Sequence, residues 1–171
     1  MSQTLVLTVI GEDRPGLVEA ISNVVSEHAA NWEASHMARV GGRFAGILQV
    51  GVAKEKAADL TAALEKLGPA GLRVIVEESV SSPEPKGQAY WIELVGSDQP
   101  NIVRDIAAAL AKREVTVLEL NSELSDAPVS GGQLFKLHAS IRCPEGLAGS
   151  ELRESLEELA NNLMVDIRID D

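Results

Sequence analysis

The chain of 171 residues carries a formal net charge of −11 at pH 7, and aromatic residues make up only 3% of it. An acidic surface repels phosphate backbones, and scarce aromatic rings leave little for bases to stack on, so direct binding of DNA or RNA is disfavoured. The single cysteine, Cys143, excludes an internal disulfide, and without a leader peptide or a long apolar run we expect a cytoplasmic protein free of membrane anchors.

The first half of the chain shows strand and helix patterns in turn. Residues 4–10 alternate as a strand does, residues 11–14 form a turn, and Pro15 is predicted at the first helical position, where its missing N–H costs nothing. This helix should run to about Ala29 or Ala30. Gly41 and Gly42 predict a two-residue hairpin. The remaining predicted elements are strands at 31–40, 43–52 and 72–78 and a helix at 54–67.

A polar, proline-bearing stretch at 81–87 is predicted to be a linker to the second half. The second half repeats the order of elements, with strands at 88–95, 115–124, 133–142 and 163–169 and helices at 100–113 and 149–161. The stretch 126–132 predicts a lengthened hairpin loop. We therefore expect two domains, at 1–80 and 88–171.

The two halves also share a repeated segment. GEDRPGLV at 11–18 matches GSDQPNIV at 96–103, and in both copies an apolar run precedes the segment and an amphipathic helix pattern follows it. A repeat of this kind indicates one small unit used twice. Each copy is predicted to be an α+β unit of ferredoxin-like βαββαβ order, a four-stranded antiparallel sheet with two helices on one face.

The loop that leads from the first strand to the first helix suits a small zwitterion. The N–H groups and the positive dipole end of a helix N-terminus can hold a carboxylate without a cationic side chain. Gly16 leaves room for a ligand to approach the backbone, and Asp13 can accept hydrogen bonds from an ammonium group. Asn31, expected beside the loop, can both donate and accept. Together these groups meet the needs of an amino acid.

The order of strand, G-x-D-R-P-G-L, amphipathic helix and then Asn31 resembles the ACT domain, a small amino-acid-sensing module. The resemblance covers nearly the whole chain as two tandem copies. It implies a ligand site between two modules, with glycine or serine as the first candidate ligands and no cofactor. Carried over residue by residue, the ligand-binding positions are Gly11, Glu12, Asp13, Arg14, Pro15, Gly16, Leu17 and Asn31.

The second copy departs from this pattern at three positions. Gln99 replaces the arginine, Asn101 the second glycine and Thr116 the asparagine. Because Asn101 adds a side chain where the first copy has none, we expect one competent site or two of unequal affinity. The possible second site comprises Asp98, Gln99, Pro100, Asn101, Ile102 and Thr116.

The same loop also has a purely structural interpretation. A D-R-P-G turn can simply start a helix, with Asp13 accepting hydrogen bonds from backbone donors and Arg14 reaching solvent. Ligand binding is the favoured interpretation for the first copy, and turn chemistry for the second.

The remaining chemically active residues form no recognisable catalytic or metal-binding set. His28, His36 and His138 are scattered without carboxylate or thiol partners at ligand spacing, and no nucleophile triad or phosphate loop is present in the sequence. We therefore expect neither an enzyme nor a metal site. Trp32 and Trp91 are predicted to fill a core or an interface, and Cys143 is predicted to be a buried, inert thiol.

A free-standing pair of ACT modules resembles regulators that control transcription without touching DNA, through a DNA-bound activator or another regulatory protein. An amino-acid-responsive repressor of this kind is the favoured hypothesis, as a monomer or a homodimer. The alternative is a ligand-independent interaction module or a detached regulatory subunit of an enzyme of amino-acid metabolism, whose exposed sheet edges pair with other copies.

Overall fold

A computed structural model describes residues 1–80, 86–127 and 132–170. The chain divides into two compact units, Met1–Ser82 and Pro83–Asp171. Most of the expected linker at 81–87, and residues 128–131 of the expected hairpin loop, lie outside the described residues. Ala127 N–H donates to the carbonyl of Gly132 across that loop, at 2.9 Å.

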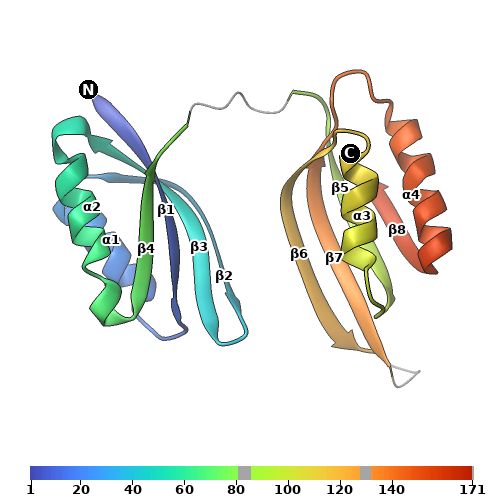
Figure 1. The fold of residues 1–171 in the computed structure, drawn as a ribbon, viewed down its shortest axis with the longest axis horizontal. Coiled ribbons are helices and arrows are strands. Elements are labelled where there is room, and N and C mark those ends of the chain that lie inside the picture. Colours follow the sequence, from blue (N-terminus) through green and yellow to red (C-terminus); the bar gives the residue numbers. More distant parts are fainter. Residues whose placement is uncertain (81–85, 128–131, 171) are drawn as a thin grey trace. The chain divides into compact units, whose positions relative to one another are not determined.

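Unit 1 has a four-stranded antiparallel sheet in the order β2-β3-β1-β4. Figure 1 shows both of its α-helices, α1 and α2, on one face of this sheet. Short 3₁₀ turns, η1 and η2, flank α2. The elements are β1 (Ser2–Glu12), α1 (Leu17–Glu27), β2 (Asn31–Val40), β3 (Arg43–Ala53), η1 (Lys54–Lys56), α2 (Ala57–Glu65), η2 (Gly68–Ala70) and β4 (Leu72–Glu78).

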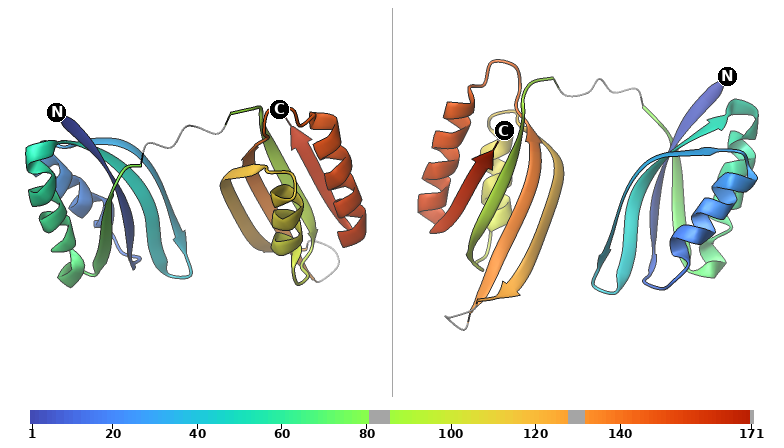
Figure 2. Two further views of the ribbon diagram at one scale, coloured as in Figure 1. Left: turned by 45° about the horizontal axis from the view of Figure 1, so that its top comes forward. Right: turned by 180° about the vertical axis from the view of Figure 1, so that it is seen from behind.

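Unit 2 repeats this topology, with the strand order β6-β7-β5-β8. Both views in Figure 2 show its two helices, α3 and α4, on one face of the sheet. The elements are β5 (Ala89–Ser97), α3 (Ile102–Ala111), β6 (Thr116–Asp126), β7 (Gln133–Arg142), α4 (Gly149–Leu163) and β8 (Val165–Asp170). The predicted pair of ferredoxin-like units is confirmed.

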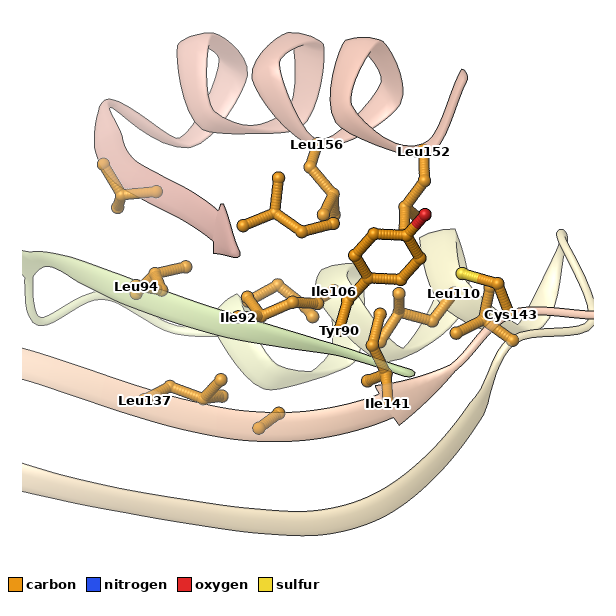
Figure 3. Close-up of a cluster of buried hydrophobic side chains, with 14 of the residues drawn as sticks. Tyr90, Ile92, Leu94, Ile106, Leu110, Leu137, Ile141, Cys143, Leu152 and Leu156 are labelled. Atoms are coloured by element: carbon orange, nitrogen blue, oxygen red, sulfur yellow. The ribbon is translucent and has the colours of Figure 1, made fainter. Parts of the chain in front are cut away.

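Each unit has its own apolar core between the sheet and its helices. In unit 1, alternate residues of β1 (Leu5, Leu7 and Val9) point inward and are at most 3% exposed, because successive strand residues face opposite sides of a sheet. In unit 2, Leu94 and Leu137 form the corresponding inward-facing layer of the sheet, where side chains of α3 and α4 pack against it (Figure 3). The many aliphatic residues of the chain thus fill two small cores, one in each unit.

Cys143 belongs to the core of unit 2, where only 1% of the residue is exposed (Figure 3). Burial raises the pKa of its thiol above the ordinary value, so less of the reactive thiolate forms at a given pH. We expect an aromatic disulfide reagent to modify Cys143 about a hundredfold more slowly in the native protein than in denaturant, because reaction must wait for local opening. Equal absorbance time courses in the two conditions would contradict this burial.

The hairpin between β2 and β3 forms as the sequence predicts. Gly41 and Gly42 have φ values of 58° and 76°, the two successive positive angles of a tight hairpin turn. The turn pairs Val40 with Arg43 and Arg39 with Phe44 across the strands. It lies at the same end of the sheet as the end of β1, because Glu12 pairs with Arg43.

The helix starts differ from those predicted. Pro15 is not the first helical residue: α1 begins at Leu17, because Gly16 has a left-handed φ of 90° that no α-helical residue adopts. The helix of unit 2 likewise begins at Ile102, after Asn101 with φ 75°, and not at Pro100.

The ends of the first two predicted helices also need correction. The first helix stops at Glu27, short of Ala29, whose φ of 53° turns the chain away. The single helix predicted at 54–67 is a 3₁₀ turn followed by α2.

Candidate ligand site

The loop between β1 and α1 is fixed to the β2–β3 hairpin. Asp13 N–H donates to the carbonyl of Gly42 at 3.1 Å, and the Asp13 carboxylate forms an ion pair with the Arg39 guanidinium. The Asp13 side chain is 27% exposed, so ligand atoms can still reach it. The structural interpretation in which Asp13 caps the helix is wrong, because among the described residues no side chain caps α1. Among the described residues, the first-turn N–H groups of α1 thus receive no side-chain cap.

Gly16 is required by its backbone conformation and not by crowding. Among the described residues, no atom outside Gly16 and its two chain neighbours lies within 4 Å of the place where its Cβ would stand. Its φ of 90° lies in the left-handed region, which glycine enters at little cost and asparagine more readily than most residues. Asn101, with φ 75°, keeps the same geometry in unit 2. The glycine-to-asparagine difference between the copies therefore preserves the shape of the loop.

The side chain after the aspartate reaches the connection before the last strand in both units. The Arg14 guanidinium lies 3.7 Å from where a Cβ on Gly71 would stand. In unit 2 the Gln99 amide donates to the carbonyl of Leu163, just ahead of β8. Gln99 is thus engaged with the protein backbone, which supports the structural interpretation for the second loop.

Four arginines gather at the loop end of unit 1. Besides Arg14 and Arg39, they are Arg43, whose Nη1 lies 3.9 Å from the Glu12 carboxylate, and Arg73, which pairs with Ile10 in the sheet. Arg43 and Arg73 line a surface pocket of about 440 Å³ together with Gly11 and Gly71. Asp13 and Glu12 pair with Arg39 and Arg43, and Glu65 lines the same pocket, so this end carries a small excess of positive charge that suits a carboxylate.

None of these four positions is an arginine in unit 2. Leu124 corresponds to Arg39, because it pairs with Phe135 as Arg39 pairs with Phe44. Leu134 corresponds to Arg43, because it pairs with Ser97 as Arg43 pairs with Glu12. The remaining two equivalents are Gln99 for Arg14 and Asp166 for Arg73. The two loop ends therefore share a backbone and differ in charge.

Of these four arginines, the sequence pattern singled out Arg14 alone. Arg39 and Arg43 flank the Gly41-Gly42 turn, and a hairpin register drawn about that turn would have brought them to the end of the first strand. Arg73 lies far along the chain, and only the pairing of β4 with β1 brings it there. The sequence therefore contained enough information to place Arg39 and Arg43 near the loop, but not Arg73.

Asn31 does not lie beside the loop, which corrects the expectation for that residue. It pairs with Gly51, which pairs with Thr4, so it lies at the opposite end of the sheet from Gly11. Gly11 lies seven residues from Thr4 in β1. At about 3.3 Å per strand residue, Asn31 is therefore roughly 23 Å along the sheet from the loop. Within unit 1, Asn31 and the loop cannot contact one small ligand.

Thr116 is equally remote from its loop. It pairs with Arg142, which pairs with Ala89 at the start of β5, whereas Asp98 follows the end of that strand. The proposed second site therefore loses Thr116, and its loop residues Asp98, Gln99, Pro100, Asn101 and Ile102 remain together.

The histidines and tryptophans stand apart from the loop. His28 ends α1, where its Nδ1 lies 2.8 Å from the carbonyl oxygen of Val24. Trp32 packs on the core of unit 1, as predicted, but Trp91 is 56% exposed and fills no core. Within the described ranges, no three His, Cys, Asp or Glu residues lie close enough together to hold a metal ion. Nor does any described helix have the length and apolarity to cross a membrane.

Comparison with known proteins places this geometry in a family. Residues 3–75, nearly all of unit 1, match the model of the ACT domain. Unit 1 is an ACT domain. The second unit of the chain repeats the same fold, so the tandem arrangement expected from the sequence is confirmed.

Relatives match this ACT-domain protein over both units. The glycine cleavage system transcriptional repressor of Escherichia coli (strain K12) is 22% identical over 161 residues, which cover 93% of this chain and 85% of the relative. An unknown protein from Galdieria sulphuraria has a crystal structure with a TM-score of 0.89 and 30% identity, covering 99% of this chain and 98% of that one. A solved structure assigned as a glycine cleavage system transcriptional repressor has a TM-score of 0.73 at 21% identity, with 99% and 97% covered, and shares the fold.

Proposed function

We propose that this ACT-domain protein is an amino-acid-responsive regulator that controls transcription through a protein partner. The ACT domain in unit 1 supports a regulatory role. So does the match to a glycine cleavage system transcriptional repressor, which is 22% identical over 93% of this chain. The net charge of −11 supports action through the surface of a DNA-bound protein and not through phosphates. Glycine and serine are the first candidate ligands in this proposal.

The proposed ligand site is the β1–α1 loop of unit 1, with seven candidate residues. The ligand carboxylate faces the first-turn N–H groups of α1 and the nearby arginines, and the ligand ammonium faces Asp13. Glycine and serine are small enough for a site built mainly from backbone. The residues are Gly11, Glu12, Asp13, Arg14, Pro15, Gly16 and Leu17.

The observation that carries this proposal is the charge difference between the two loop ends. Arg14, Arg39, Arg43 and Arg73 in unit 1 correspond to Gln99, Leu124, Leu134 and Asp166 in unit 2. Because both loops keep the same backbone, the arginines are not needed to form the fold. A carboxylate ligand would account for Arg14 and Arg39, which lie in the loop or contact it, and we expect one competent site per chain.

Ligand binding would act on the hairpin through Asp13. In the free protein this carboxylate is paired with Arg39 of β2. An ammonium group that shares Asp13 weakens that pair and so changes the link between the loop and the hairpin. The response of a partner can be no larger than the preference of the ligand for one of the two arrangements.

A thermal-shift screen against the twenty amino acids, followed by calorimetric titration, tests the site. A ligand at one hundred times its dissociation constant should stabilise the protein by about 2.7 kcal/mol. Asp13→Asn removes the charge but keeps the shape, and should weaken binding roughly 10- to 100-fold, the value of a charged hydrogen bond. Arg14→Gln, which copies the residue of unit 2, should also weaken it.

The matched control is Gln99→Arg in unit 2, which should leave the affinity unchanged. Unchanged affinity in both Asp13→Asn and Arg14→Gln would mean that the ligand binds elsewhere. If no amino acid shifts the melting temperature, the ligand-independent interaction module becomes the better hypothesis.

The partner-mediated step has its own test. The purified protein alone should not change the fluorescence anisotropy of labelled promoter DNA at physiological salt, with or without glycine. Binding of bare DNA by the pure protein would contradict indirect regulation. A cytoplasmic location fits this role and stays a prediction.

A further inference from the structure

The sheet of unit 1 has an apolar outer face, on the side away from its own helices. Ile47, Thr8 and Ile75 form one row across β3, β1 and β4, and Ile10 lies in the next row. Ile47 and Ile75 are each 52% exposed and Ile10 is 42% exposed. Val6 lies two residues beyond Thr8 on the same face. Four aliphatic side chains thus surround one threonine on an open sheet.

The same face of unit 2 is charged. His138, Glu93 and Arg168 occupy the row that corresponds to Ile47, Thr8 and Ile75. The ring of His138 lies 4.0 Å from the Glu93 carboxylate, and the Lys136 ammonium lies 3.9 Å from Glu123 in the next row. The central row of the outer face is therefore charged in unit 2 and apolar in unit 1. The isoleucines are not required by the topology, and grouped exposed aliphatic residues mark an interaction surface.

We propose that a second copy of this chain covers the apolar face, with the two sheets of unit 1 packed face to face about a two-fold axis. The evidence for this occupant is the order of charges on β4. Arg73, Ile75 and Glu77 are alternate residues of this strand and share the outer face. A two-fold axis that runs across the strands reverses β4 against itself, so that Ile75 meets its own copy. Arg73 then faces Glu77 of the partner subunit, and the reverse pair forms at the other end.

The other strands fit the same axis. Ile47 of β3 meets its own copy, and Ile10 of β1 lies over Val6 of the partner subunit. Sheets in sandwiches pack in this aligned manner with strand directions within about 30° of each other. Four strands about 4.8 Å apart give a face roughly 19 Å wide, which is small for a permanent interface. We therefore expect a reversible dimer whose fraction rises with protein concentration.

Sedimentation velocity of the full chain over a wide concentration range tests the dimer. Wild-type protein should shift from monomer to dimer as its concentration rises. Ile75→Arg and Ile47→His place on unit 1 the residues that unit 2 carries at the same positions, so they should keep the fold. Each should weaken the dimer at least about tenfold, because a buried charge or polar ring replaces apolar contact. Trp91→Lys, on the outer face of unit 2, is the control and should change nothing.

A charge exchange tests the two-fold arrangement itself. Arg73→Glu and Glu77→Arg alone should each weaken the dimer, because each places like charges opposite one another. The double variant should restore wild-type dimerisation. Circular dichroism identifies any variant that has lost its fold.

Three results would overturn the proposal: a chain that stays monomeric at every concentration, a dimer that tolerates Ile75→Arg and Ile47→His, or a double charge exchange that fails to restore association. Asp13→Asn should leave the dimer intact, so failure of the ligand site and failure of the dimer are distinguishable.

Discussion

Replacing Leu64 by alanine should lower the free energy of unfolding of unit 1 by about 2–5 kcal/mol, the usual cost of removing a buried leucine side chain. Leu64 is 0% exposed and belongs to the core cluster that α2 forms with Ile21 of α1 and Leu72 of β4. The lost methyl groups leave a cavity because neighbouring side chains relax only in part. Urea unfolding followed by far-ultraviolet circular dichroism measures the loss.

The second unit supplies a matched comparison for this variant. Leu156 occupies the corresponding face of α4 and is 2% exposed, so Leu156→Ala should cost a similar amount in unit 2. Leu118→Ala, at a residue that is 45% exposed, should change stability by no more than about 0.5 kcal/mol. Equal effects of the buried and the exposed substitutions would contradict the assignment of the core.

Replacing Gly16 by valine should cost about 1–3 kcal/mol of stability, although nothing touches the place of the new Cβ. The cause is the left-handed φ of 90°, which a β-branched residue adopts only with strain. Chemical denaturation of the two proteins measures the difference. Gly16→Val is therefore not a neutral probe of ligand binding, because a lost response could come from a distorted loop.

Gly16→Asn is the better variant. Asn101 already holds φ 75° at the matching place in unit 2, so asparagine should cost clearly less than valine. Gly16→Asn adds a side chain beside the proposed ligand while the backbone keeps its shape. If asparagine and valine destabilise the protein equally, backbone conformation is not what selects glycine here.

Local patterns in the sequence predicted the fold well. The strands at Asn31–Val40 and Leu72–Glu78 match their predicted bounds. Gly41 and Gly42 end the first strand and Gly71 precedes the second, each with a positive φ angle that interrupts extended backbone. The helix starts were missed because Pro15 favours a first helical position, whereas the left-handed Gly16 postpones the helix. Composition alone does not show which φ a glycine will adopt.

The site was less predictable because it depends on contacts between distant segments. Asn31 follows α1 closely in the chain, but α1 has 11 residues and carries the chain about 16 Å back along the sheet. Much of its distance from the loop follows from that length, and the strand pairing accounts for the rest. Arg73 could be assigned only once β4 was paired with β1. The loop itself was visible because its function depends on consecutive residues.

Under the proposed function, the restriction of the four arginines to one loop end would also determine how ligand occupancy depends on ligand concentration. A monomer with a single carboxylate site would fill along a hyperbolic curve, so its occupancy would change gradually over a wide range of amino-acid concentration. A second, equal site in the other unit would have allowed the two to be coupled and the curve to steepen. Under the proposed function, duplication of the unit followed by divergence of one loop would give each chain a graded response to amino-acid supply.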